Sequence, residues 1–141
     1  MILMSDNSTI SVQDIMMPIG SFPMVSEENL FHETLQEMMK WGLGIACIVN
    51  AENTLRAVLT DGDIRRMLLT VQKPTSALHV DKVMKFAMQN PITVVPSNSL
   101  VAVINLMEEK AIWDVPVVDN EGTLVGLVHL HPVVKALLDK Y

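Results

Sequence analysis

An internal duplication limits what this chain can fold into more strongly than any other feature of its sequence. When the sequence is laid over itself with an offset of 69 residues, several positions meet identical residues and many others pair apolar with apolar. One unit of this size is too small to bury its own sheet face well, so two copies are expected to pack as a pair. The identical positions are Val25, Asn29, Met38, Val49, Glu52, Thr54, Leu55, Leu68 and Leu69, which meet Val94, Asn98, Met107, Val118, Glu121, Thr123, Leu124, Leu137 and Leu138.

Both copies contain the same succession of expected elements, and the predicted class is α/β with two β-α-β-β-α repeats related by a pseudo-twofold axis. Ser26 is expected to cap the first long helix, Ser97 or Asn98 to begin its counterpart, and Pro132 to open the last helix. The first copy has expected helices at 12–18, at 27–40 and after 60, and extended segments at 22–25, 45–49 and 55–59. The extended segments of the second copy are expected at 92–95, 115–118 and 124–128.

This pattern divides the chain into four stretches. Residues 1–11 are polar and irregular and are expected to be a flexible N-terminus. Residues 12–70 form repeat 1, residues 71–79 a connection, and residues 80–141 repeat 2.

Composition excludes several classes of protein. The 141 residues have a formal net charge of −6 and no basic stripe, which argues against nucleic-acid binding. No apolar run approaches the roughly 20 residues needed to cross a bilayer, and the N-terminus lacks the features of a signal peptide. Cys47, the single cysteine, lies in an apolar run and is interpreted as a buried thiol in a reducing, cytoplasmic compartment.

The stretch from Leu59 to Arg66 predicts a strand that turns directly into a helix. Helix N-termini present unpaired N–H groups, Gly62 permits close approach of a ligand, and Thr60 adds a hydroxyl. The carboxylate of Asp63 could accept bonds from two sugar hydroxyls. Thr60 and Asp63 also fit a capping box that only satisfies the first turn of the helix, so a ligand site and a local cap both remain open.

Two arginines follow in the first helical turn. Positive charge is unfavourable there unless an anion is near, so Arg65 and Arg66 favour a bound phosphate. The alternative is an ion pair with Asp61 or Asp63.

The sequence resembles the tandem cystathionine-β-synthase (CBS) domain pair, or Bateman module, over nearly all of its length. It is most similar to the CBS pair at the C-terminus of bacterial arabinose-5-phosphate isomerases, and a related stretch occurs in CBS pairs attached to sugar-nucleotide transferases. The isomerase domain is not within these residues, so the chain is expected to be a separate module or a fragment. The motifs that carry the resemblance are Leu59–Arg66, Asn90–Val94, Pro116–Asp119 and Gly126–His131.

The resemblance implies that a nucleotide binds in a cleft between the repeats. Thr60 and Asp63 match the family pattern, with roles at the phosphate and the ribose, although Ala57 replaces the family's glycine. The second repeat departs from that pattern, with His129 in place of the threonine and Pro132 in place of the aspartate, so one site is expected to dominate. The remaining predicted ligand-binding residues are Asp61, Gly62, Arg65, Arg66, Ile45, Ala46, Ile92, Thr93, Val94 and His131.

Two histidines and two tryptophans are further candidates for a functional role. His129 and His131 could face one side of a strand as half of a metal site, but no metal is predicted. Trp41 and Trp113 are interpreted as packing or dimer contacts. No nucleophile with a paired base and no carboxylate dyad is present in the pattern, so no catalytic residues are predicted.

The predicted function is a regulatory module that senses AMP, ADP, ATP or a CMP-sugar and controls a sugar-phosphate or sugar-nucleotide enzyme. No catalytic cofactor is expected. The expected partners are a second copy of the chain and a sugar-isomerase or nucleotidyltransferase domain, with no membrane. The alternative is a constitutive dimerisation module with a vestigial pocket, and an enzyme in its own right is disfavoured.

Overall fold

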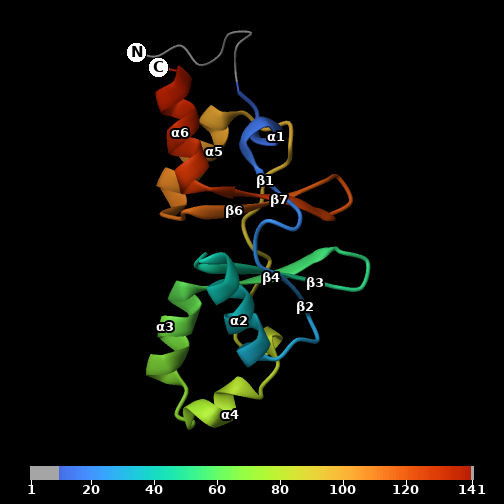
Figure 1. Ribbon diagram of the computed structural model, residues 1–141, viewed down its shortest axis with the longest axis vertical. Helices are drawn as coiled ribbons and strands as arrows, with labels where there is room; N and C mark the ends of the chain where they lie inside the picture. The colour runs from blue at the N-terminus through green and yellow to red at the C-terminus, as the bar shows by residue number, and fades with distance from the viewer. Residues whose placement is uncertain (1–9, 141) are drawn as a thin grey trace. The chain divides into compact units, whose positions relative to one another are not determined.

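The structure is a computed structural model that describes residues 10–140 (Figure 1). The chain forms two compact units. One comprises residues 20–91, and the other combines residues 92–140 with the described residues up to 19.

The unit of residues 20–91 contains a four-stranded sheet in the order β2-β3-β4-β5. The β2 and β3 strands are parallel, and the other neighbours are antiparallel. Helices α2 and α3 lie on one side of this sheet (Figure 1). The strands are β2 (Met24–Ser26), β3 (Ile45–Val49), β4 (Leu55–Thr60) and β5 (Met88–Gln89), and the helices are α2 (Phe31–Trp41), α3 (Asp61–Thr70), α4 (Thr75–His79) and the 3₁₀ turn η1 (Val83–Lys85).

The central strand of this unit is β3, and every one of its residues is buried, including Cys47. A continuous apolar run predicts such a strand because the sheet is covered by neighbours. The core that packs around it consists of Val25, Phe31, Met38, Ala46, Ile48, Ala57, Leu59, Met67, Leu78 and Val83.

The second unit contains a three-stranded antiparallel sheet in the order β1-β7-β6. Residues 92–95, expected to be extended, contribute only a parallel bridge between Val94 and Val117. Gly126 in β7 is tightly covered, because an added Cβ would lie 2.6 Å from the sulfur of Met16. The elements are α1 (Val12–Ile15), β1 (Met17–Pro18), α5 (Leu100–Lys110), β6 (Asp114–Val118), β7 (Leu124–His129) and α6 (Leu130–Lys140).

The duplication extends to fine detail and confirms the α/β repeat architecture. The register shifts at Ile48/Val49 in one sheet and at the equivalent Val117/Val118 in the other. The turn before each last strand is also built alike: a side-chain oxygen of Asn50 or of Asp119 accepts two backbone N–H bonds.

Each compact unit contains one strand from the beginning of the other sequence repeat. β1 pairs with β7, which is distant in sequence, and β5 pairs with β4. The packing units therefore do not coincide with the sequence repeats, which were expected at 12–70 and 80–141. The expected connection, 71–79, contains α4.

Residues 1–9 of the expected flexible N-terminus lie outside the described residues. The end of that stretch is held in place, because the carbonyl of Ile10 accepts a hydrogen bond from the N–H of Leu100 at 2.8 Å. Ser11 forms a bridge with Ser99.

The first long helix begins at Phe31, so the expected start at residue 27 is wrong. The hydroxyl of Ser26 accepts the N–H of Glu28 at 3.0 Å, and Asn29 accepts the N–H of Ser26 at 2.8 Å. This local turn uses the serine that was expected to cap the helix. The carboxylate of Glu33 accepts the N–H of Leu30 instead.

The equivalent helix α5 is capped by Ser99, not by Ser97 or Asn98. The Ser99 hydroxyl accepts the N–H of Ala102 at 3.0 Å, whereas Asn98 accepts the N–H of Val95. The last helix begins at Leu130, two residues before the Pro132 that was expected to open it. No helix in the described part of the chain has the length and apolar character needed to span a bilayer.

Candidate functional site

The predicted turn from β4 into α3 is present, and its geometry is a complete capping box. The Thr60 hydroxyl accepts the N–H of Asp63 at 3.2 Å, and the Asp63 carboxylate accepts the Thr60 N–H at 2.9 Å. The same carboxylate oxygen also accepts the Thr60 hydroxyl proton at 3.0 Å. The local-cap interpretation is therefore confirmed, and the ligand role of these residues stays a prediction.

Asp63 is a buried charge, only 8% exposed. Its second carboxylate oxygen accepts a hydrogen bond from the guanidinium of Arg66, and the two groups form an ion pair. Burial of a carboxylate is tolerated only when it is paired and hydrogen-bonded, and Asp63 meets this condition with three donors. The Arg66 side chain is 62% exposed, so this cation remains accessible.

The other predicted residues of the turn lie close by. The guanidinium groups of Arg65 and Arg66 both approach the Cα of Gly62, within 3.8 Å of where a Cβ would be. Asp61 donates its N–H to the carbonyl of Gly44 at 3.0 Å, and its carboxylate covers the Gly44 Cα. The start of α3 thus combines backbone N–H groups with two arginines and two carboxylates.

Strand β3 supports this turn from the side. Ile45 is the register partner of Thr60, and Ala46 is the partner of Leu59. Both are buried apolar residues. They can supply an apolar wall beside the turn but no polar contact from their side chains.

Four of the predicted residues belong to the other compact unit. Val94 is buried, and Ile92 and Thr93 are exposed. His131 is exposed at the second position of α6.

The counterpart turn of the second repeat has different chemistry. Nδ1 of His129 lies 2.6 Å from a carboxylate oxygen of Asp114, and the two residues are register partners in β6 and β7. In the first repeat the equivalent pair is Ile45 and Thr60. The sequence reasoning missed this pair, although the simultaneous replacement of both partners was visible in the offset comparison.

The expectation that His129 and His131 share one face of a strand is wrong, because β7 ends at His129 and His131 lies in α6. Among the described residues, no group of three or more His, Cys, Asp and Glu side chains could hold a metal ion. Trp41 donates its ring N–H to Glu37 at 3.1 Å, and Trp113 is 69% exposed.

Comparison with known proteins relates the second half of the chain to a known family. Residues 80–139 match the family model of the CBS domain. The arabinose 5-phosphate isomerase KdsD of Francisella tularensis is 28% identical over 126 residues, which cover 89% of this chain and 37% of that protein. The chain spans between 35% and 38% of the length of the curated relatives it matches.

Solved structures agree on the fold. CBSX2 of Arabidopsis thaliana, crystallised in complex with AMP, has a TM-score of 0.82 and 24% identity, and the match covers 93% of this chain and 98% of that one. The CBS domain pair of protein MJ0100, in complex with 5′-methylthioadenosine and S-adenosyl-L-methionine, has a TM-score of 0.77 and 22% identity, covering 94% of this chain and 99% of that one. The second half of the chain matches the CBS domain family, and the duplicated β-α-β-β-α architecture gives the whole chain the fold of a CBS domain pair.

Proposed function

We propose that the chain is a regulatory module whose ligand is a nucleotide, bound at the turn from β4 into α3. The observation that carries this proposal is the buried carboxylate of Asp63, paired with the exposed Arg66 at the start of a helix. A capping box needs no arginine, whereas a nucleotide offers hydroxyl donors and a phosphate at the same time.

Each part of a nucleotide has a matching group at this turn. The phosphate is an anion suited to the N–H groups at the start of α3 and to Arg65 and Arg66. The ribose hydroxyls are donors suited to the Asp63 carboxylate, which has about four lone-pair positions and uses three of them. One acceptor position of Asp63 is therefore open to a ribose hydroxyl, and a turn of Arg66 toward the phosphate would free a second one.

The preferred ligand class is an adenosine nucleotide, AMP, ADP or ATP. Support comes from CBSX2, which was crystallised with AMP, and from the MJ0100 pair, which was crystallised with two other adenosine compounds. A CMP-sugar is the second candidate, because the relatives named KdsD act on a sugar phosphate, and an activated sugar would be a suitable feedback signal.

The test is calorimetric titration of each of these nucleotides into the protein and into Asp63→Ala. Loss of hydrogen bonds to a charged group should cost about 1.5–3 kcal/mol of binding, which is roughly a 10- to 150-fold weaker Kd. Arg66→Ala should weaken binding of the phosphorylated ligands but not that of adenosine.

Ser99→Ala is the matched control, because it removes a helix cap that has no predicted ligand role. It should lower stability and leave the Kd unchanged. Equal Kd values for the wild type, Asp63→Ala and Ser99→Ala would contradict the ligand role of this turn.

We further propose that the module controls a sugar-phosphate isomerase or a nucleotidyltransferase, within one chain or as a partner. The identity with KdsD over most of this chain supports the isomerase. Isomerase activity of the enzyme that carries or binds the module should change as the nucleotide saturates the site. Activity that stays constant through saturation would favour the alternative, a constitutive dimerisation module with a vestigial pocket.

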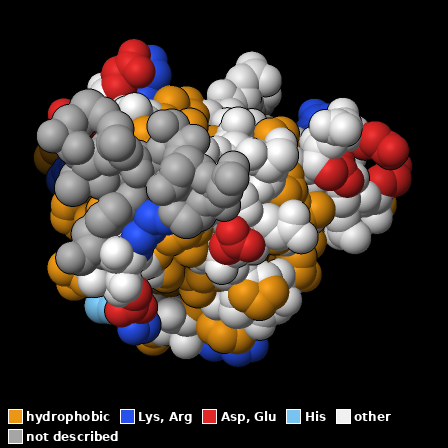
Figure 2. All heavy atoms as spheres, turned by 90° about the horizontal axis from the view of Figure 1, so that it is seen from above, with side chains coloured by type: hydrophobic (Ala, Val, Ile, Leu, Met, Phe, Trp, Pro, Cys, Tyr) orange, Lys and Arg blue, Asp and Glu red, His pale blue; other side chains and the backbone are white. Residues whose placement is uncertain are grey.

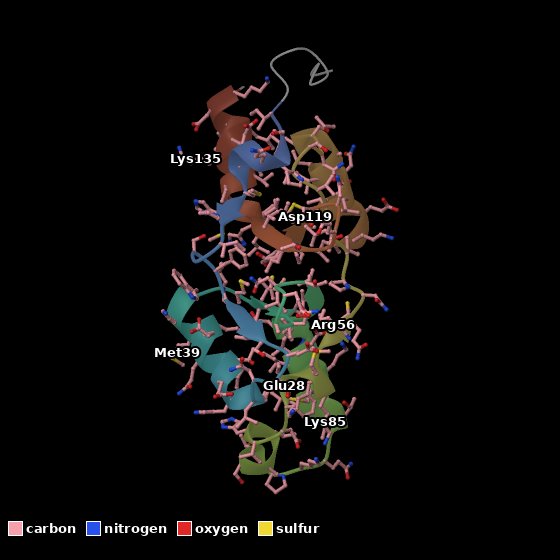
Figure 3. The ribbon with its side chains drawn as sticks, turned by 90° about the vertical axis from the view of Figure 1, so that its right-hand side faces the viewer. Glu28, Met39, Arg56, Lys85, Asp119 and Lys135 are labelled. Carbon is pink, nitrogen blue, oxygen red and sulfur yellow. The ribbon has the colours of Figure 1, made fainter. Side chains whose placement is uncertain are left out.

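A homodimer is the proposed assembly. Met39 on α2 is 85% exposed and points away from the ribbon (Figure 3), and Leu69 on α3 is 82% exposed. Hydrophobic side chains also reach the surface between charged ones on the face that Figure 2 shows. Light scattering at tens of micromolar should give twice the 15.7 kDa of one chain, and Met39→Lys should reduce it to the monomer value. A monomer in the unmodified protein would refute the dimer.

A further inference from the structure

Two histidines from separate helices meet at the surface of the unit of residues 20–91. Nδ1 of His32 lies 3.1 Å from Nδ1 of His79. The ring centroids are 4.8 Å apart, and the ring planes make an angle of 30°. The residues come from the start of α2 and the end of α4, 47 positions apart in sequence.

Packing below the pair fixes the position of one ring. The His79 ring lies 6.2 Å from the ring of Phe31, and Phe31 packs edge-on against Phe86 at 5.3 Å. Phe31 is buried, so the two helices meet over a firm apolar base. His32 is exposed, and His79 is half-buried.

Two facing Nδ1 atoms cannot both carry a hydrogen. When the rings are neutral, one Nδ1 donates and the other accepts, or both lone pairs point toward a shared cation. Zinc–nitrogen bonds of about 2.0–2.1 Å place two ligand atoms roughly 3.3–3.4 Å apart in a tetrahedral site and about 2.9 Å apart when the ligands are at right angles. The observed 3.1 Å lies within this range.

We propose that His32 and His79 bind one divalent transition-metal ion, such as Zn²⁺, Ni²⁺ or Cu²⁺, through their Nδ1 atoms. Nearby carboxylates are engaged elsewhere: Glu33 accepts bonds from Leu30 and Asn29, and Asp81 accepts bonds from two lysines. Water therefore completes the coordination. Imidazole is a preferred ligand of all three ions.

A bound ion would tie α2 to α4 and so to the segment that connects the two repeats. An ion that binds only the folded state raises the melting temperature in proportion to the logarithm of its concentration once the site is saturated. The inference is independent of nucleotide binding, because its residues are not among those of the turn at Thr60.

The experiment is titration of EDTA-treated protein with ZnCl₂ and NiCl₂ at pH 7.5, followed by calorimetry and thermal unfolding. One ion per chain should bind, and the melting temperature should rise. His32→Gln and His79→Gln should each weaken binding at least tenfold while the circular dichroism spectrum stays native. His131→Gln is the matched control and should bind as the wild type does.

A simple hydrogen bond between the rings gives a different outcome. In that case no saturable binding is seen below about 1 mM metal, and the proposal is overturned. It is equally overturned if binding survives both His32→Gln and His79→Gln, or if His131→Gln abolishes it. Histidine ¹H–¹³C spectra recorded with added Zn²⁺ should show shifts at two of the four histidines only.

Discussion

Asp63→Asn is the most informative single change in this protein, because it preserves the shape of the side chain and removes its charge. One carboxylate oxygen now accepts two bonds from Thr60, and the other accepts from Arg66. Asparagine has only one acceptor oxygen, and its NH₂ group would face a donor on one side in either orientation.

The expected loss of stability follows from the hydrogen bonds that Asp63 accepts. If the amide oxygen faces Thr60, two charge-assisted bonds become neutral ones, and the bond to Arg66 is lost. Bonds to charged groups contribute about 1.5–3 kcal/mol and neutral ones about 0.5–1.5 kcal/mol, so the change at the two Thr60 bonds should lower the free energy of unfolding by about 2–3 kcal/mol. The ion pair adds little to this loss because Arg66 is mostly exposed.

Urea unfolding at pH 7 measures this loss, with Arg66→Ala and Ser99→Ala beside it. Arg66→Ala should cost at most about 1 kcal/mol. Ser99→Ala should cost about 1 kcal/mol, because only one cap bond is removed. An Asp63→Asn variant within about 0.5 kcal/mol of the wild type would refute the reasoning, and so would an Arg66→Ala variant that costs as much as Asp63→Asn.

Three further outcomes are expected. Gly126→Ala should lower the free energy of unfolding by about 1–3 kcal/mol, measured by urea unfolding, because its Cβ would overlap the methionine sulfur that covers this glycine. The pKa of Asp81 lies below its ordinary value because the ammonium of Lys73 donates a hydrogen bond to it. The ionised Asp81 carboxylate should therefore stabilise the folded state above about pH 5, and this contribution should be lost as the pH falls through the lowered pKa. The melting temperature of Asp81→Asn should accordingly depend less on acid pH than that of the wild type. Calorimetry should give one dominant nucleotide site per chain, and the double change His129→Thr with Pro132→Asp should strengthen a second one; two equal sites in the unmodified protein would contradict this.

Sequence reasoning succeeded where the signal was local or repeated. The apolar run at 45–49 is strand β3, and the predicted turn at Thr60 is the start of helix α3, as expected. Both features are determined by residues close together in the sequence. It failed at the helix starts, because the side chains of Ser26 and Asn98 can either cap a helix or stabilise a tight turn. Which of the two forms depends on which backbone N–H group the side-chain oxygen accepts.

The pairing of distant segments was beyond the sequence pattern for another reason. Strands β1 and β5 are two residues long, and so short a strand has no alternating pattern from which its neighbour in the sheet could be predicted. The pair of His32 and His79 is separated by 47 residues and belongs to no motif. The chemistry of the turn left the ligand role of Asp63 open and the family resemblance favoured it, whereas its cap follows from the spacing of Thr60 and Asp63.

The place of β1 in the sheet of β6 and β7 has a consequence for biosynthesis. Residues 10–18 leave the ribosome roughly a hundred residues before β7, which at about 5–20 residues per second is a delay on the order of 5–20 s. The unit of residues 20–91 is continuous in sequence and can close during that time. Val12 is fully buried in the folded protein, but its core partners belong to the last third of the chain. Until that part has been synthesised, the apolar side chain of Val12 remains exposed to water or bound to a chaperone.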